Sequence, residues 1–403
     1  MSNPTTAVFD LQSSLGGTGS AGSIALTGVE PIRYDSGLYL EEGTTNFFIN
    51  PGPGGGSATG WIQAGSATVG YGEDGDGPYA TLTRTSGAMG YQNGTAEAPL
   101  VAPGEVVTIQ GKLRSPNATL NCRVRIRFYD AASAGGSQVG ESLGTLASVG
   151  SSWVGFEHSG TAPASTVSAR VTFLNTDTGS GGDVLHLKLA QGEVKSYATS
   201  YTDGTLGTGY AWTGTDYAST STRAASSASL SPAGIIDTYL GAIVFRLTPT
   251  IETEVEEVWG ELGEKGAGTD HIQWGRDSSK HPFVEWSGND SAYTRITLDG
   301  TVDAGDEHFY SIEWHVGDEI FTLYQDALPG ESDAIPSPQE DYGGESLTLK
   351  ASAGGVIYNG ILIANERLTD EQRATLLSKE NWSMNTLSAP QRRYEFFQLR
   401  PGV

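Results

Sequence analysis

The chain has 403 residues, and because β architectures often use about 200 residues in one piece, we expect two domains. With 55 glycines and only 23 lysines and arginines, it is rich in turns and poor in helix formers, which argues against a helical bundle, a coiled coil or a Rossmann enzyme. Its net charge of −24 repels phosphate backbones and anionic lipid, so we expect no nucleic-acid partner and no membrane insertion.

The first 45 residues predict an N-terminal arm. They begin as polar, glycine-rich sequence and continue into two short strand-like runs at 23–26 and 37–40. Because little of this stretch is apolar, we expect it to gain order by docking on another surface.

Residues 46–195 predict an antiparallel β-sandwich, because short strands alternate with turn residues roughly every 8–12 positions. The clearest strand is 122–129, in which arginines alternate with valine, isoleucine and phenylalanine. Side chains alternate between the two faces of a strand, so Arg123, Arg125 and Arg127 should share one face. Further strands are expected at 79–84, 106–113, 152–160, 168–174 and 184–191.

Residues 196–225 are rich in serine, threonine, glycine and alanine and carry little that could fill a core. We predict an extended linker here, ordered in part by Tyr201, Tyr210, Trp212 and Tyr217.

Residues 226–382 predict a second β-sandwich, so the expected fold class is all-β, with two antiparallel sandwiches joined by the linker. One helix is expected near its end, because Thr369 and Gln372 form a capping box. Residues 383–403 are net basic and predict a C-terminal tail with a short aromatic strand at 394–399. The strands expected in the second sandwich are 240–247, 251–259, 271–274, 283–287, 293–298, 308–315, 319–325 and 355–363.

The charge is unevenly divided between the two predicted sandwiches. Residues 46–195 hold 11 acidic and 9 basic side chains, a net of −2, whereas residues 226–382 hold 28 and 9, a net of −19. The single cysteine, Cys122, cannot form an intramolecular disulfide, and the first 15 residues lack the features of a secretory signal. We therefore expect a chain that folds in a cytoplasm.

Three runs of sequence carry a resemblance to known domains. The run GLYLEEGTTN at 37–46, followed by Asn50-Pro51 and Gly60-Trp61, resembles the opening of jelly-roll carbohydrate-binding modules in tailed-phage structural proteins. The run GDVLHLKLAQGE at 182–193 is similar to the last strand of the same modules. The run GILIANERLTDEQ at 360–372 is similar to the closing strand and helix of concanavalin-like, or laminin-G-type, sandwiches.

The region between the sandwiches carries the most specific resemblance. The sequence from ATSYTDG at 198–204 to ASTSTR at 218–223 looks like the connector of minor tail proteins of siphophages. Members of that family often have a Pro-His pair where this chain has Asp216-Tyr217. The resemblance implies a jelly-roll domain, a concanavalin A-like lectin domain and a virion protein of a tailed bacteriophage.

As a minor tail or tail-tip protein, the chain would be assembled in the host cytoplasm and would act by adhesion, without enzymatic activity. The implied partners are other virion structural proteins, a host-surface glycan and further copies of the chain, with a trimer favoured. A capsid decoration or head-fibre protein would share the same domains, and a cell-wall polysaccharide glycosidase or depolymerase is a second alternative.

Arginines and tryptophans are the candidate ligand-binding residues. Arg123, Arg125 and Arg127 could hold an anionic wall polymer through charge-assisted hydrogen bonds, or could instead pair with acids of a neighbouring strand or subunit. An exposed tryptophan suits the apolar face of a pyranose, whereas most tryptophans of β-sandwiches lie in the core. The sugar-stacking candidates are Trp61, Trp153 and Trp286.

Acidic residues suggest two further sites. Asp74 and Asp76 lie in a flexible turn, and Asp183 matches an acidic position of the resembling modules, in which a structural Ca²⁺ often bridges the first and last strands. We expect no required cofactor, and Ca²⁺ is the ion that these acidic side chains would bind. On the predicted strand 251–259, Glu252, Glu254 and Glu256 would share one face, which suggests either glycosidase carboxylates or a solvated acidic surface.

Overall fold

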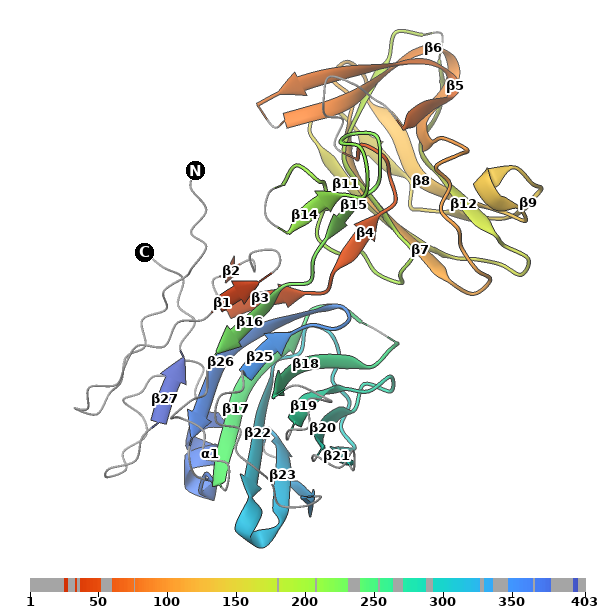
Figure 1. Cartoon of the computed structure of the whole chain (residues 1–403). Coiled ribbons are helices and arrows are strands. Elements are labelled where there is room, and N and C mark those ends of the chain that lie inside the picture. The colour runs from red at the N-terminus through yellow and green to blue at the C-terminus, as the bar shows by residue number, and fades with distance from the viewer. Residues whose placement is uncertain are drawn as a thin grey trace. The chain divides into compact units, whose positions relative to one another are not determined.

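The computed structural model describes residues 25–27, 33–34, 37–51, 60–75, 77–179, 181–206, 209–230, 240–252, 254–263, 271–287, 293–326, 330–335, 347–364, 367–377 and 394–397. They form two compact units, drawn in Figure 1. Gly43–Ala224 is one unit, called here the first sandwich. The described residues up to Glu42 join those from Ala225 onward in the other unit, called here the second sandwich.

The first sandwich is built from antiparallel strands that wrap around one core. In hydrogen-bonded order its main sheet runs β10-β8-β12-β6-β13-β7-β11, with β5 on β6 and β9 on β8. The first half of β6 pairs with β13 and its second half with β12, so this one long strand belongs to both layers. The strands are β5 (Trp61–Asp74), β6 (Gly77–Asn93), β7 (Val106–Arg114), β8 (Leu120–Tyr129), β9 (Gln138–Leu143), β10 (Ala147–Val149), β11 (Val154–Thr161), β12 (Ser168–Gly179) and β13 (Val184–Glu193), with a short 3-10 turn at Ala132–Ala134.

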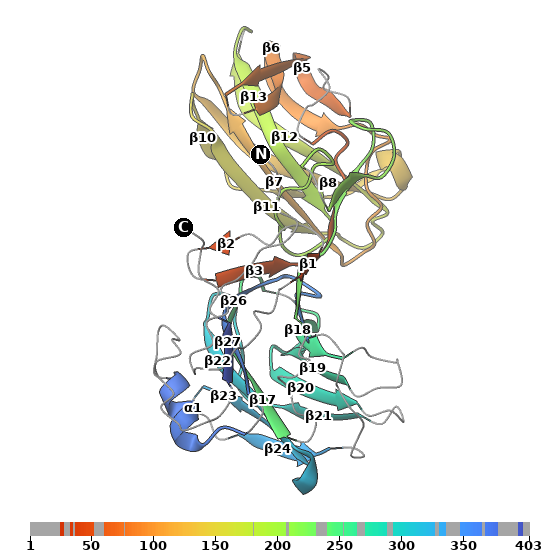
Figure 2. The ribbon, with the colours of Figure 1, turned by 60° about the vertical axis from the view of Figure 1, so that its left-hand side comes forward.

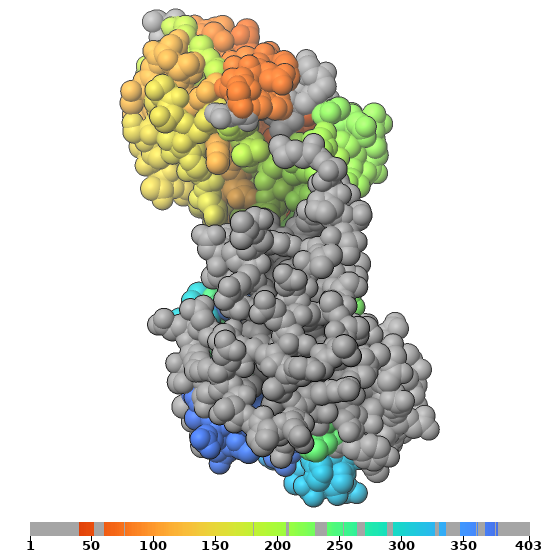
Figure 3. Space-filling model, turned by 90° about the vertical axis from the view of Figure 1, so that its left-hand side faces the viewer, coloured from red at the N-terminus to blue at the C-terminus, as the bar shows by residue number. Residues whose placement is uncertain are grey.

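The alternation of β8 is confirmed by its burial. Val124, Ile126 and Phe128 are buried in the core, and the arginines between them are half-buried on the outer face. The two layers pack closely, since a Cβ added at Gly111 of β7 would lie 2.9 Å from the ring of Phe173 on β12. In the space-filling view, the orange residues of β5 and β6 lie at the surface of this unit (Figure 3).

The segment predicted as a linker is part of the first sandwich. Its strands β14 (Tyr210–Trp212) and β15 (Ser221–Arg223) form a sheet with β4 (Thr44–Asn46). The side-chain amide of Asn46 donates to the carbonyls of Ala190 and Thr202, at 2.9 and 3.1 Å, and so ties the segment to the last long strand. Hydrogen bonds from polar side chains replace the apolar core that the sequence of this segment cannot supply.

The second sandwich has two antiparallel sheets, which face each other in Figure 2. One runs β1-β16-β25-β18-β19-β20-β21 and the other β2-β3-β26-β17-β22-β23-β24, with β27 also on β26. The core between them contains Trp259, Trp274, Trp286 and Trp314. The strands are β1 (Ala25–Thr27), β2 (Arg33–Tyr34), β3 (Gly37–Glu41), β16 (Ser227–Leu230), β17 (Leu240–Pro249), β18 (Glu257–Leu262), β19 (His271–Arg276), β20 (Pro282–Ser287), β21 (Tyr293–Thr297), β22 (His308–His315), β23 (Ile320–Gln325), β24 (Glu331–Ala334), β25 (Leu347–Lys350), β26 (Gly355–Ala364) and β27 (Tyr394–Phe397), with a 3-10 turn at Val316–Asp318.

The predicted all-β class with two antiparallel sandwiches is confirmed, and the terminal segments differ from the predicted arm and tail. Within its own chain β1 pairs with β16, β3 pairs with β26, and β27 pairs with β26. The described parts of both ends therefore complete sheets of the second sandwich.

The predicted helix is present as α1 (Asp370–Leu377). Its capping box is formed, because the N–H of Gln372 donates to Oγ1 of Thr369 at 3.2 Å and the N–H of Thr369 donates to Oε1 of Gln372 at 2.7 Å. No helix among the described residues is long and apolar enough to span a bilayer.

Candidate functional site

One outer face of the first sandwich gathers aromatic and basic side chains from three strands and from the residue before β11. Strand pairing sets His186 opposite Arg114, and it pairs Val154 with Leu113, which places Trp153 beside Arg114. The core takes the alternate residues of these strands. We call the resulting group the aromatic–basic cluster, and its members are Tyr79, Arg114, Trp153, His186 and Lys188.

The rings and cations of this cluster are in direct contact. Tyr79 and His186 stack with their ring centroids 4.2 Å apart. The guanidinium carbon of Arg114 lies 4.5 Å from the centroid of the Trp153 ring, and the Nζ of Lys188 lies 4.2 Å from it. These are cation–π distances, so the cations and the rings hold one another in place.

A glycine of the neighbouring strand makes room for Tyr79. Gly72 on β5 pairs with Tyr79, and a Cβ added at Gly72 would lie 2.5 Å from the tyrosine ring. The ring therefore lies over bare backbone, which lets it stack on His186.

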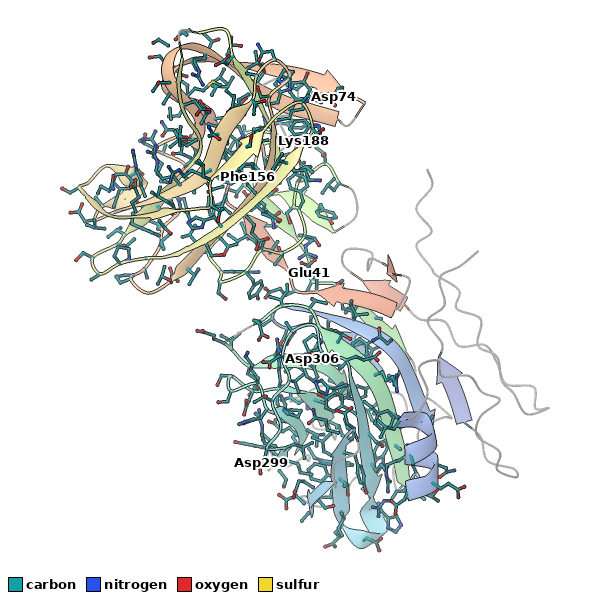
Figure 4. All side chains as sticks on the ribbon, turned by 180° about the vertical axis from the view of Figure 1, so that it is seen from behind. Glu41, Asp74, Phe156, Lys188, Asp299 and Asp306 are labelled. Atoms are coloured by element: carbon teal, nitrogen blue, oxygen red, sulfur yellow. The ribbon has the colours of Figure 1, made fainter. Side chains whose placement is uncertain are left out.

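The electrostatics of the cluster are dominated by its cations. Arg114 pairs with Asp74 and donates through Nε to Nδ1 of His186 at 3.1 Å. Burial, and then the nearby Arg114, lower the pKa of His186 to about 4, so this imidazole is neutral near pH 7. Figure 4 shows Asp74 at the end of β5 and Lys188 nearby.

The arrangement combines two kinds of contact that sugars use. Tyr79 and Trp153 are half-buried and offer ring surface to an apolar sugar face. The guanidinium of Arg114 can donate hydrogen bonds to hydroxyl or carboxylate oxygens, whereas Lys188 is buried and supports the Trp153 ring. The face is thus chemically suited to a saccharide, above all one that carries an acidic group.

Of the three predicted stacking residues, only Trp153 lies on this face. Trp61 is 5% exposed, donates its indole N–H to the carbonyl of Asn50 at 3.0 Å, and packs in the core of the first sandwich. Trp286 is fully buried in the core of the second sandwich. A ring enclosed in a core offers no face to a ligand, so both assignments as stacking residues were wrong.

The three predicted arginines share one outer face, on the opposite layer from the aromatic–basic cluster. Arg127 pairs with Glu141 of β9, with 3.4 Å between Nε and Oε2. Burial, followed by the charges of Arg127 and Arg123, lowers the pKa of Arg125. The predicted pairing with acids of a neighbouring strand thus holds for Arg127.

The predicted calcium ligands do not gather into one cluster among the described residues. Asp74 pairs with Arg114, and Asp183 lies 3.5 Å from Nε of Arg84. No group of three metal-ligating side chains occurs in the part of the chain that the structure describes, and Asp76 lies outside that part. Calcium binding therefore stays a prediction.

The predicted acidic strand at 251–259 was wrong in its first half, since the strand begins only at Glu257. Glu252 pairs with Lys280 at 2.8 Å, and Glu256 pairs with Arg295 at 2.8 Å. Each carboxylate is thus held by a cation from a different strand or loop. The geometry supplies no common face on which these residues could work as a glycosidase pair.

Three members of the cluster were not singled out from the sequence. Arg114, His186 and Lys188 are polar residues at outward positions of strands whose alternate residues are apolar. The alternation around 185–188 could have placed His186 and Lys188 on one face, but only the pairing of β13 with β7 brings Arg114 to them.

Comparison with known proteins gives distant likenesses only. No family model and no curated protein matches the chain. Among solved structures, the enzymatically active domain of bacteriophage CBA120 tailspike protein 4 is similar over 37% of this chain and 21% of its own, with 16% identity and a TM-score of 0.30. The CBM22-1 xylan-binding domain of Xyn10C from Paenibacillus barcinonensis is similar over 41% of this chain and 100% of its own, with 18% identity and a TM-score of 0.29.

Proposed function

We propose that the protein is a structural component of a phage virion, a minor tail or tail-tip protein, and that its first sandwich binds a glycan of the host surface. The observation that carries the binding role is the aromatic–basic cluster on an outer face of the sheet. The virion assignment rests on the connector-like sequence at 198–223.

The cluster has the composition of a binding site more than that of a catalytic one. None of its five members is a carboxylate, Asp74 beside it is paired with Arg114, and its histidine is neutral near pH 7. Glycoside hydrolysis needs two carboxyl groups on either side of the scissile bond. We therefore propose adhesion without hydrolysis.

A glycan array probed with the full chain tests the binding role. Trp153→Ala removes the ring that carries two cations, and we expect binding to weaken roughly 10-fold or more. Trp212→Ala is the matched control, because Trp212 is a half-buried tryptophan of the same unit that contacts Tyr217 instead. Equal binding by both variants, or the absence of any bound glycan, would refute the proposed site.

The place in the virion is tested separately. Mass spectrometry of separated heads and tails should find the chain in the tail fraction. Signal in heads alone would replace the tail assignment with a head-fibre or decoration role. Analytical ultracentrifugation of the full chain tests the proposed homo-oligomer, for which a trimer is favoured.

A further inference from the structure

A row of arginines crosses the outer face of the first sandwich on the layer opposite to the aromatic–basic cluster. Arg123, Arg125 and Arg127 alternate along β8, and the pairing of β8 with β12 sets Arg170 directly opposite Arg127. Directly opposite residues of antiparallel strands point to the same side of a sheet, so the four guanidinium groups share one face. We call this set the arginine row.

The charge of the row is largely uncompensated. Glu141 is the one acidic side chain within ion-pair distance of it among the described residues; it pairs with Arg127, and its charge also favours the charged form of Arg125. The Nε atoms of Arg123 and Arg125 are buried and make no hydrogen bond in the part of the chain that the structure describes. Arg170 uses its Nε to donate to the carbonyl of Asn93 at 3.2 Å, which orients it without neutralising it.

Such a row is costly for the folded protein alone. Burial disfavours the charged form of Arg125, and so do the neighbouring Arg127 and Arg123; the opposing effects of Glu141 and Tyr129 do not cancel them, and the pKa of Arg125 is lowered. An anion placed along the row would offset these costs by bringing opposite charge to the guanidinium groups. The row is therefore arranged for a ligand of opposite charge.

The spacing of the row favours a polymer over a single ion. Alternate residues of a strand lie about 6.5–7 Å apart, so the three arginines of β8 present cations at regular intervals over roughly 13 Å. A chain with an acidic group on each repeating unit can contact several of them at once, and multiple contacts of this kind reinforce one another.

We propose that the arginine row binds an anionic polysaccharide or polyol-phosphate chain, as a second ligand site distinct from the aromatic–basic cluster. The overall charge of −24 does not prevent this, because at physiological ionic strength charges more than about 8 Å away are largely screened. Polymer binding at the arginine row does not depend on glycan binding at the aromatic–basic cluster.

The test uses the full chain and two defined polymers, polygalacturonate for carboxylates and inorganic polyphosphate for phosphates, with neutral dextran for comparison. Binding to at least one of the two polyanions, weaker at high salt, is expected. The double variant Arg123→Gln/Arg125→Gln should weaken binding by roughly 10-fold or more, since each lost contact is a charge-assisted hydrogen bond. The polymer that responds identifies the acidic group that the row prefers.

Three controls make the result decisive. Lys280→Gln/Lys350→Gln removes the same charge from the second sandwich and should leave polymer binding within about twofold. Arg123→Lys/Arg125→Lys keeps the charge and should retain part of the affinity if the first variant is folded. Trp212→Ala, which alters a half-buried tryptophan outside both proposed sites, should leave polyanion binding unchanged.

Several results would overturn the proposal. Equal losses of polymer affinity in the arginine and lysine double variants would show that binding depends only on net charge. Failure of the native chain to bind either polyanion would show that the arginine row does not bind this class of ligand. Competition by single-stranded DNA at lower concentration than either polymer would assign the row to nucleic acid. Loss of oligomers in the arginine variant, without loss of polymer binding, would assign it to contact with an acidic surface of a second copy.

Discussion

The buried pair of Glu257 and Arg276 shows how single side chains organise the second sandwich. Both side chains are fully buried, with 3.0 Å between Nε of Arg276 and Oε2 of Glu257. Arg276 also donates to the carbonyls of Val302 and Ile251, at 2.8 and 2.6 Å. One guanidinium thus fixes the start of β18 and two loops, and its removal would leave an uncompensated buried carboxylate.

This pair makes the stability of the second sandwich depend on pH. Burial raises the pKa of Glu257 to about 7, against the lowering effect of Arg276. A carboxyl whose pKa is higher in the folded state contributes stability below its unfolded pKa and loses it as pH rises through about 7. Glu257→Gln cannot lose a proton, so from pH 5 to pH 8 the wild type should lose roughly 2 kcal/mol relative to this variant.

Urea unfolding followed by tryptophan fluorescence measures this difference, because four tryptophans lie in that core. Glu254→Gln, at an exposed position nearby, serves as the control and should show no such change with pH. A difference between wild type and Glu257→Gln that is constant from pH 5 to pH 8 would contradict the assignment.

At this scale, sequence patterns predict which face of a strand a residue occupies and fail to predict its partners. The alternation on β8 gave the common face of Arg123, Arg125 and Arg127 correctly. The burial of Trp61 and Trp286 could not be read in the same way, because a tryptophan serves a core and a sugar platform equally well. Partners such as Lys280 for Glu252 come from other strands and loops, which only the fold brings together.

The start of helix α1 depends on its capping box, in which Thr369 supplies the hydroxyl acceptor. Thr369→Ala removes the acceptor for the N–H of Gln372, and we expect a loss of about 1 kcal/mol in the local stability of the first turn. Hydrogen exchange of the first amides of α1 should accelerate roughly fivefold. Thr369→Ser keeps the hydroxyl and should exchange like the wild type, whereas equal exchange in all three proteins would show that the cap is unimportant.

The same helix has an independent anchor at Arg373, its fourth residue. Arg373 donates to Oε1 of the buried Glu313 on β22 at 2.7 Å and to the carbonyl of Leu368 at 2.8 Å. Loss of the cap should therefore loosen the first turn without detaching the helix from the sheet.

Elements were predictable where local pattern and long-range pairing agree. The bounds expected for β22 match the structure at both ends, since its residues alternate between the two sides of a central strand. The expected strand at 251–259 failed in its first half, since the chain bends at 254–255 and its ladder with β19 begins only at Glu257. The apparent linker failed because its order comes from polar hydrogen bonds such as those of Asn46, which composition does not reveal.

At the scale of the whole molecule, the first sandwich is an insertion within the second. The chain leaves the second sandwich after β3 and returns to it at β16, and the two crossing points lie side by side. The N–H of Ser226 donates to the carbonyl of Glu41 at 2.9 Å, and on the inserted side Arg223 pairs with Thr44. The sequence predicted two successive domains instead. Because β3 ends only two residues before the first sandwich begins, it was assigned to an arm in front of that sandwich.

Deleting residues 43–224 and joining Glu42 to Ala225 through a short glycine-serine link should leave a folded second sandwich. Directly paired residues lie about 5 Å apart, so the link closes a gap that the chain already spans. Cooperative unfolding and near-ultraviolet circular dichroism of the core tryptophans would show the fold. A deletion variant without a cooperative transition would mean that the second sandwich depends on the first.

The nested order has a consequence for how the protein is made. During translation β3 leaves the ribosome early, but its partner strand β26 is synthesised only after the entire first sandwich and most of the second. The inserted unit can complete its own fold while β3 is paired only with β2 and still lacks β26. The second sandwich is therefore completed only after the first has been made, and a chain truncated after Ala224 would carry the first sandwich together with β2 and with β3, which lacks its partner strand β26.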